Sequence, residues 1–397
     1  MRRLVLLLSS LGGCAGALLA ASGPVACSDT ATSAADVDAA QPADATADGA
    51  DADAAEATVV PRGARVLGVS VVIGDVDFQK NVQLIRDAGA RTTNVTFAWD
   101  DVERPYDAGA PVSDDGGTDA STPTQIFNPL VHVTNLVLPD ERMGATLTID
   151  ALDVGGSRAP AELAALPFDD VELATRYGRV TDYVLDQLPD TEITALFLGS
   201  AVDLPLGTDA AKHAAFASFV TRAVAHVHAL QPKVKVGFVV SAAGAIAAKE
   251  LLGPAWAASD VVGITYLPVD AAAQARPTSE VASDLERLLA ALPVGKPIVI
   301  REAGYPTAPQ CGSDPAAQAA FIRATFGAWD RHADRIPVVT FRELDDIGAI
   351  EAATLGRRRG RTDAPFLAFL QSLGLRGLVT SKQGLATLNE EARARGF

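Results

Sequence analysis

Cysteine, histidine and basic side chains are scarce in this 397-residue sequence. Its three cysteines, Cys14, Cys27 and Cys311, exclude a disulfide-stapled fold, and its five histidines have no spacing typical of a metal site. We therefore expect neither a metal nor another cofactor. Lysine and arginine number 33 against 49 acids, and the formal charge of −16 argues against nucleic acid as a partner. Hydrophobic residues make up 48% of the chain, which excludes a wholly disordered protein.

The first 27 residues have the pattern of an export signal. Arg2 and Arg3 precede an apolar, small-residue run from Leu4 to Ala21, which predicts a signal peptide rather than a membrane anchor. Cys27 stands where this run gives way to a polar tail, and the junction resembles a bacterial lipoprotein cleavage site. We predict a lipid on Cys27 that tethers the exported protein to the bacterial cell envelope, at the outer membrane or the cell surface. Ordinary signal cleavage would instead give a secreted or periplasmic protein.

Two segments lack the composition of a folded core. Residues 28–60 consist mainly of Ala, Asp, Thr and Gly without an aromatic side chain, and they predict a disordered acidic linker. Residues 109–123 predict a solvated loop, because their acids lack the spacing and closing Glu of a calcium loop. The predicted organisation is a signal peptide at 1–27, the linker at 28–60 and one folded domain at 61–397.

Short apolar runs alternate with helical patterns from residue 65 onward. Eight strands are predicted, at Val66–Ile73, Thr93–Ala98, Ala145–Leu152, Ile193–Leu198, Val234–Val240, Val261–Tyr266, Pro297–Arg301 and Pro337–Phe341. Helices are expected at Asp77–Ala88, Asp170–Leu188, Asp209–Leu230, Ser279–Leu292, Pro315–His332 and Ala364–Leu373. This α/β repeat predicts a single (β/α)8 TIM barrel. A doubly wound sheet would need a glycine-rich phosphate turn after the first strand, and residues 71–75 are not one.

In such a barrel the ligand site lies at the carboxyl ends of the strands, and here those ends are rich in carboxylates and aromatics. The candidate site residues are Trp99, Glu103, Asp150, Ser200, Ala201, Asp203, Tyr266, Glu302, Tyr305, Arg342 and Glu343. No Ser-His-Asp set, thiol nucleophile or phosphate loop occurs among these strand ends. Aromatic rings stack on sugar faces and paired carboxyl groups cleave glycosidic bonds, so this composition favours carbohydrate. Taken singly, each acid is more often a loop cap or a member of an ion pair than a catalytic group.

The order of these motifs resembles the clan A retaining glycoside hydrolases over nearly the whole folded part. Residues 296–306, KPIVIREAGYP, look like the family's strand 7, whose glutamate is the nucleophile. Residues 259–266, SDVVGITY, resemble its strand 6, and residues 99–105 resemble its Trp…Glu-Pro segment after strand 2. The resemblance implies that Glu302 occupies the nucleophile position and that Tyr266 hydrogen-bonds it.

The resemblance breaks at the general acid. The family's strand 4 ends in Gly-Asn-Glu, whereas this chain has Gly199-Ser200-Ala201 in that register. Ser200 replaces the asparagine and Ala201 replaces the acid/base glutamate, and alanine cannot transfer a proton. Loss of a general acid costs about 10²–10⁴ in rate. The resemblance therefore implies the scaffold and a carbohydrate ligand without implying hydrolysis.

Three interpretations remain open at this stage. In the first, the protein is a degenerate glycosidase that binds sugar without cleaving it, with Trp99 and Tyr305 in the cleft. In the second, it is a retaining hydrolase whose acid comes from Asp203 or Glu343, with Asp150 and Glu103 as further candidates. In the third, the barrel is a surface interaction module without a sugar ligand. A carboxyl group within about 6 Å of the nucleophile position would favour the second interpretation.

Arginines complete the sequence-based picture of the site. Glu302 follows Arg301 and faces Arg342 across neighbouring strands, which predicts a buried salt bridge whether or not the glutamate reacts. Residues 356–361, GRRRGR, form a basic segment that we expect to be a solvated loop, with contact to anionic glycan or lipid headgroups as the alternative. We expect a monomer.

Overall fold

The computed structural model describes residues 59–105, 124–378 and 382–397. The predicted signal peptide, Cys27, most of the predicted linker and the predicted loop at 109–123 lie outside these residues and stay predictions. Within the described ranges, no helix is both long and apolar enough to cross a bilayer.

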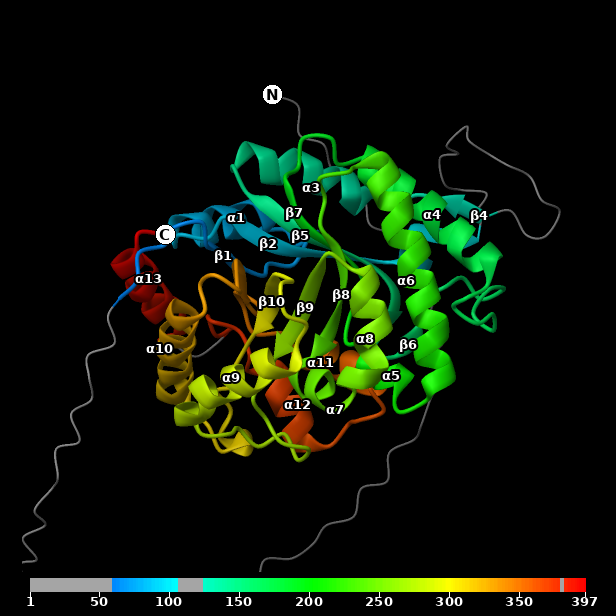
Figure 1. Cartoon of the computed structure of the whole chain (residues 1–397). Coiled ribbons are helices and arrows are strands. Elements are labelled where there is room, and N and C mark those ends of the chain that lie inside the picture. The colour runs from blue at the N-terminus through cyan, green and yellow to red at the C-terminus, as the bar shows by residue number, and fades with distance from the viewer. Residues whose placement is uncertain (1–58, 106–123, 379–381) are drawn as a thin grey trace, which may run out of the picture. The chain divides into compact units, whose positions relative to one another are not determined.

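Eight parallel strands close into a barrel, which confirms the predicted (β/α)8 fold (Figure 1). In the order in which they pair around the barrel, the strands are β2 (Thr92–Ala98), β1 (Val66–Val69), β11 (Val338–Phe341), β10 (Ile298–Ala303), β9 (Val261–Tyr266), β8 (Val236–Ser241), β7 (Ile193–Gly199) and β5 (Gly144–Asp153). Pairing of β2 with β5 completes the ring. All eight predicted strands are present. The first ends at Val69 rather than Ile73, because Ser70–Ile73 leave the sheet and line a cavity.

Helices surround the strands, as Figure 1 shows. The longer ones are α1 (Phe78–Asp87), α3 (Pro129–Asp140), α4 (Val171–Asp186), α6 (Ala210–Leu230), α8 (Lys249–Ala258), α9 (Val281–Ala291), α10 (Pro315–Arg331), α11 (Ala349–Arg358), α12 (Ala364–Gln371) and α13 (Gly384–Arg395). Short helices follow three strands, at α2 (Trp99–Val102), α5 (Asp203–Leu206) and α7 (Ala242–Ala247). The hairpin of β3 (Glu103–Pro105) and β4 (Thr124–Ile126) and the two-residue strand β6 (Gly156–Ser157) lie outside the ring. Asp170, Asp209, Asp314 and Asp363 cap four of the helices by accepting hydrogen bonds from first-turn amides.

Alternate residues of each strand point to opposite faces, and the two faces form separate cores. One set packs against the helices and includes Leu196, Val262 and Ile300. The alternate set fills one side of the barrel interior with the apolar side chains Ala195, Phe197, Val239, Val261, Val299 and Val338. On β2 the same alternation instead places Thr92, Asn94 and Thr96 inward. The barrel interior therefore becomes polar toward β2, and the site develops on that side.

Candidate functional site

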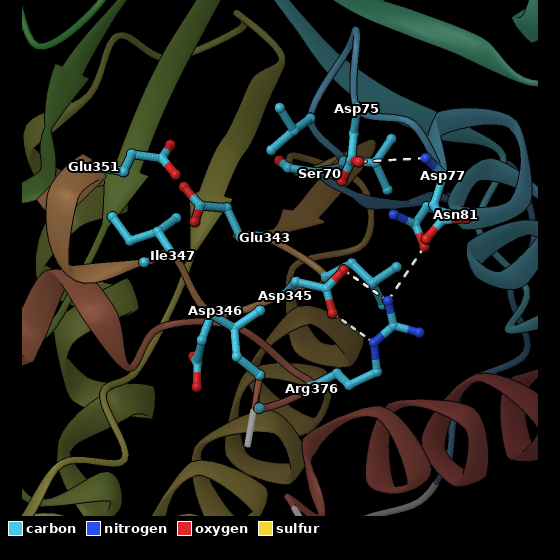
Figure 2. A pocket seen from close by; sticks show the side chains of 16 residues that line it. Ser70, Asp75, Asp77, Asn81, Glu343, Asp345, Asp346, Ile347, Glu351 and Arg376 are labelled. Carbon is cyan, nitrogen blue, oxygen red and sulfur yellow. Dashed lines mark hydrogen bonds and ion pairs between the residues drawn. The ribbon is translucent and has the colours of Figure 1, made fainter. Parts of the chain in front are cut away.

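A cavity of about 310 Å³ opens at the carboxyl ends of β1, β2, β10 and β11. It is lined by Ser70, Val71, Val72, Ile73, Asn94, Thr96, Phe97, Leu130, Arg301, Glu302, Arg342 and Glu343. We call this space the arginine cleft. A second cavity of about 450 Å³ adjoins it and shares Ser70, Val71, Val72 and Glu343 with it (Figure 2). The second cavity carries six acids (Asp75, Asp77, Glu343, Asp345, Asp346 and Glu351) and one arginine, and we call it the acidic cavity.

Glu302 lies in the arginine cleft because strand β10 is irregular at its end. Ile300 pairs with Ile264 of β9, yet Glu302 pairs with the very next residue, Thr265, so one residue of β10 is extra. Such a bulge re-aims side chains. Here two consecutive side chains, Arg301 and Glu302, both line the cleft.

Both oxygens of the Glu302 carboxylate are paired with arginine. Arg301 Nη1 donates to Oε1 at 2.8 Å, and Arg342 Nη1 donates to Oε2 at 2.9 Å. This confirms the predicted salt bridge. Burial opposes ionisation of Glu302, but the charges of Arg342 and Arg301 outweigh it and hold the pKa below its usual range. Glu302 is thus an ionised carboxylate, as a nucleophile must be.

Strand β2 holds the arginine in place. Arg301 Nη2 donates to Thr96 Oγ1, and Asn94 Nδ2 donates to the Arg301 carbonyl oxygen and to Ser70 Oγ, both at 2.7 Å. The sequence-based candidates did not include Asn94, Thr96 or Ser70. The sequence signal that could have identified Asn94 and Thr96 is the polar residue at every second position of strand β2, which is otherwise largely apolar.

Glu343 is a second carboxyl in the arginine cleft. Its Oε1 lies 3.3 Å from Arg342 Nε, so one arginine joins it to Glu302. Its backbone is left-handed, with φ of 49°, which costs a non-glycine residue about 1 kcal/mol. Burial raises the pKa of Glu343, the charge of Glu302 raises it further, and Arg342 only partly opposes this. The pKa values of the two carboxyls are therefore moved in opposite directions.

No carboxyl group stands at the family's acid position. Ala201 follows β7 with a left-handed φ of 50°, and its methyl group is the whole side chain. Asp203, two residues on, points elsewhere: Oδ1 accepts from Ser241 N at 2.8 Å and Oδ2 from Ser241 Oγ at 2.7 Å. Asp203 lines neither cavity. Its placement disagrees with its prediction as a replacement acid, because both oxygens tie the end of β7 to β8.

Asp150 lies inside the barrel at an irregular part of β5. Thr148 pairs with Phe197 and Leu152 with Gly199, so three β5 residues stand opposite one β7 residue. Burial raises the pKa of Asp150 to about 7, although the charge of Arg301 lowers it. Within the described part of the chain, Asp150 Oδ1 and Ser200 Oγ are buried without a hydrogen-bond partner. Neither residue lines the two cavities, so the prediction that they contact substrate is not supported by their placement.

Trp99 and Glu103 bond to each other rather than facing the cleft. Trp99 has no exposed surface, its Nε1 donates to Glu103 Oε2 at 2.7 Å, and its ring packs edge-on against Tyr177 at 5.2 Å. The other Glu103 oxygen accepts from Arg176. The placement of Trp99 disagrees with its prediction as a sugar platform, because its side chain is completely buried.

Tyr266 and Tyr305 are also buried outside the cleft. The hydroxyl of Tyr266 donates to Asp284 Oδ2 at 3.1 Å, so the expected bond to the nucleophile position is absent. Burial and the charge of Asp284 raise the pKa of Tyr266. The hydroxyl of Tyr305 donates to the Arg276 carbonyl oxygen at 2.7 Å. Both rings are core aromatics, and among the described residues no tyrosine or tryptophan lines the arginine cleft.

No family model and no curated protein sequence matches this chain. Solved structures share its fold. An exo-β-1,4-mannosidase from Opitutaceae bacterium strain TAV5 has a TM-score of 0.61 at 15% identity, covering 83% of this chain and 59% of that one. A GH5_18 protein from Streptomyces cattleya in complex with GlcNAc has a TM-score of 0.59 at 12% identity, covering 84% and 80%. A β-glucosidase from Thermotoga maritima in complex with deoxynojirimycin has a TM-score of 0.56 at 10% identity, covering 84% and 99%.

These similarities concern the barrel. The chain spans less than two thirds of the length of the mannosidase, and it spans 64% of a family 39 glycoside hydrolase from Bacteroides cellulosilyticus. At identities of 15% and below, the shared property is the fold. The protein is a (β/α)8 barrel.

Proposed function

We propose that this protein is an exported, lipid-anchored barrel that binds carbohydrate and is impaired in hydrolysis. The observation that carries the proposal is Ala201 at the end of β7, where the resemblance places the general acid, in a barrel whose nucleophile position still holds an ionised glutamate. Retaining hydrolysis needs one carboxylate to attack and a second carboxyl group to protonate the leaving oxygen. Glu302 can serve the first step, and the methyl group of Ala201 cannot serve the second.

The lining of the arginine cleft supports a sugar ligand. Arg301, Arg342, Asn94 and Ser70 bring guanidinium, amide and hydroxyl groups to one small cavity, and Glu302 supplies a strong acceptor. Such mixed donors and acceptors match a ring bearing several hydroxyl groups. Two solved structures of the same fold hold GlcNAc and deoxynojirimycin, which also supports a carbohydrate ligand.

One observation favours an active enzyme as the second candidate. Glu343 lies in the same cleft as Glu302, shares Arg342 with it, and has a raised pKa where that of Glu302 is lowered. Environments that move two carboxyl pKa values apart define the acid and the nucleophile of a glycosidase. In that case Glu343 would protonate the leaving oxygen from strand β11 instead of β7.

A set of substitutions separates these functions. We expect the natural protein to bind oligosaccharides from a glycan panel without cleaving them, and Ala201→Glu to restore cleavage. Ala201→Gln has the same backbone strain and nearly the same side-chain size, so it controls for shape without supplying a proton. Adding Glu302→Gln to Ala201→Glu should abolish the restored activity.

Cleavage by the natural protein would contradict impairment. If that cleavage disappears in Glu343→Gln, the second candidate function replaces the first. If no sugar in the panel binds and none is cleaved, carbohydrate binding itself is refuted, and the interaction-module interpretation replaces it.

The anchor is tested separately. Mass spectrometry of the mature protein should find Cys27 as the first residue with a diacylglyceryl group, and Cys27→Ser should move the protein from the membrane fraction to the soluble fraction. An unmodified N-terminus at Cys27 or another residue would refute lipidation.

A further inference from the structure

The acidic cavity holds more negative charge than the described part of the protein balances. Three of its six acids are paired with a cation: Asp345 with Arg376, Asp346 with Lys382, and Glu343 with Arg342. Asp77 has only Lys80 at 3.9 Å, and both of these side chains are more than half exposed. Asp75 and Glu351 form no ion pair with any described residue. Two carboxylates of this cavity therefore lack a counter-charge.

One of these two carboxylates faces another acid. Figure 2 shows Glu343 and Glu351 with their carboxyl groups turned toward each other, and both residues line the cavity. Burial raises the pKa of Glu343, and the charges of Glu302 and Glu351 raise it further. Like charges that face each other disfavour ionisation of both groups. A cation placed at this point would relieve the repulsion.

A metal ion does not account for the charge of this cavity. Among the residues that the structure describes, no three Asp, Glu, His or Cys side chains are arranged to hold a metal ion. The volume of about 450 Å³ is far larger than one ion needs. It lies within the range of about 300–1,000 Å³ that is typical of pockets for small organic ligands. The cavity therefore fits an organic cation.

Uncharged side chains in the cavity wall suit the neutral part of such a ligand. Asn81 is only 4% exposed, and its Oδ1 accepts from Arg376 Nη2 at 3.2 Å, whereas its Nδ2 has no acceptor among the described residues. A buried amide donor without an acceptor calls for a ligand oxygen. Val72 and Leu378, which also line the cavity, are 53% and 61% exposed. Exposed aliphatic side chains at a cavity offer contact to the C–H groups of a ligand.

The acidic cavity is continuous with the arginine cleft, since Ser70, Val71, Val72 and Glu343 line both. A glycan in the cleft can therefore extend into the acidic cavity. We propose that the glycan bound by this protein carries a free amino group, and that this ammonium group lies in the acidic cavity beside Glu351. The inference rests on the proposed carbohydrate binding and names the class of sugar. An ammonium group donates up to three hydrogen bonds, and those to carboxylates are charge-assisted.

The test compares oligosaccharides that differ only in their amino groups. Oligomers of glucosamine and of galactosamine are titrated against their N-acetylated forms with the full mature protein. A pH of about 5.5 keeps the amine protonated and carboxyl groups of ordinary pKa ionised. In at least one series we expect the free amine to bind about 10-fold more tightly, since a hydrogen bond to a charged group contributes about that much.

A double variant removes the two carboxylates that lack a counter-charge. Asp75→Asn combined with Glu351→Gln should lower the preference to about 2-fold or less and leave binding of the acetylated forms unchanged. Glu172→Gln combined with Glu286→Gln is the matched control, because it changes the net charge equally at two exposed acids that line neither cavity. The control should keep the preference. Thermal unfolding verifies that both variants are folded.

The outcomes separate this proposal from carbohydrate binding itself. Equal binding of the free and acetylated forms overturns the amino-sugar proposal and leaves carbohydrate binding standing. A preference that survives in the cavity variant, or that falls equally in the control, also overturns it, because the attraction then comes from the overall charge of −16. If no amino sugar binds in either form, the proposal fails, and the glycan panel decides separately on carbohydrate binding.

Discussion

Asp150→Asn should stabilise the protein at neutral pH while leaving its stability in acid almost unchanged. The Asp150 carboxyl is buried inside the barrel, and its pKa is raised from an ordinary 3.8 to about 7. The folded protein therefore keeps a proton on this group between about pH 4 and pH 7, where the unfolded chain has lost it. Linkage then requires that stability falls as pH rises through this range.

The size of the effect follows from the same pKa. Each pH unit between the two pKa values changes the free energy of unfolding by about 1.4 kcal/mol, so the whole effect is on the order of 4 kcal/mol. This loss of stability is complete above about pH 7, where the buried carboxylate is charged. Asparagine has the same shape without the charge, so Asp150→Asn removes this loss.

Urea unfolding of both proteins at half-unit steps from pH 4 to pH 8 measures the effect. The difference in unfolding free energy between Asp150→Asn and the natural protein should be near zero at pH 4 and grow to a few kcal/mol at pH 8. The acid end is an internal control, because the carboxyl is neutral there in the folded state. A difference that does not change with pH would show that Asp150 titrates like an exposed carboxyl, and the reasoning from burial would fail.

Three further substitutions concern the scaffold. Gly237→Ala should destabilise the barrel by about 1–3 kcal/mol, because a methyl group there would lie 2.1 Å from a backbone oxygen of strand β9. Gly253→Ala in α8, where nothing lies within 4 Å of the added methyl group, should instead stabilise by about 0.5–1 kcal/mol; urea midpoints that rank the two variants the other way would contradict this. Asp330→Asn should cost about 3–5 kcal/mol, because the carboxylate pairs with the buried guanidinium groups of Arg65 and Arg395, and calorimetry showing an unchanged melting temperature would refute it.

The strands were predictable because buried parallel strands are apolar along their whole length. Val261–Tyr266 matches the prediction at both ends, and the other strands differ by a few residues. Helix α3 was missed, because its apolar residues are spread around the helix and give a weak amphipathic pattern. The segment Lys249–Ala258 was missed as well, since a proline at position 254 argues against a helix interior, yet the helix continues through it.

The site was predictable where the contacts are local to the strand ends. Glu302 with its two arginines follows from adjacency in sequence and across neighbouring strands. The aromatic residues were not predictable in this way. The ring of Trp99 packs against Tyr177, and the hydroxyl of Tyr266 donates to Asp284. Both partners are distant in the sequence, so the sequence does not show whether these aromatic side chains face the cleft.

The inward-facing side chains of strand β10 change from apolar to charged along the strand. Val299 and Arg301 are two residues apart on β10 and point inward at successive layers. The lower layer is filled by apolar side chains, most of them valines, which pack without electrostatic cost. The upper layer holds a buried guanidinium whose Nε has no acceptor. Since replacing buried charges by apolar side chains is often neutral or stabilising, a barrel that served only as scaffold would gain by continuing the valine layer upward. This buried guanidinium lies at the carboxyl end of its strand, where (β/α)8 barrels bind their ligands, and this position argues for a ligand in the arginine cleft.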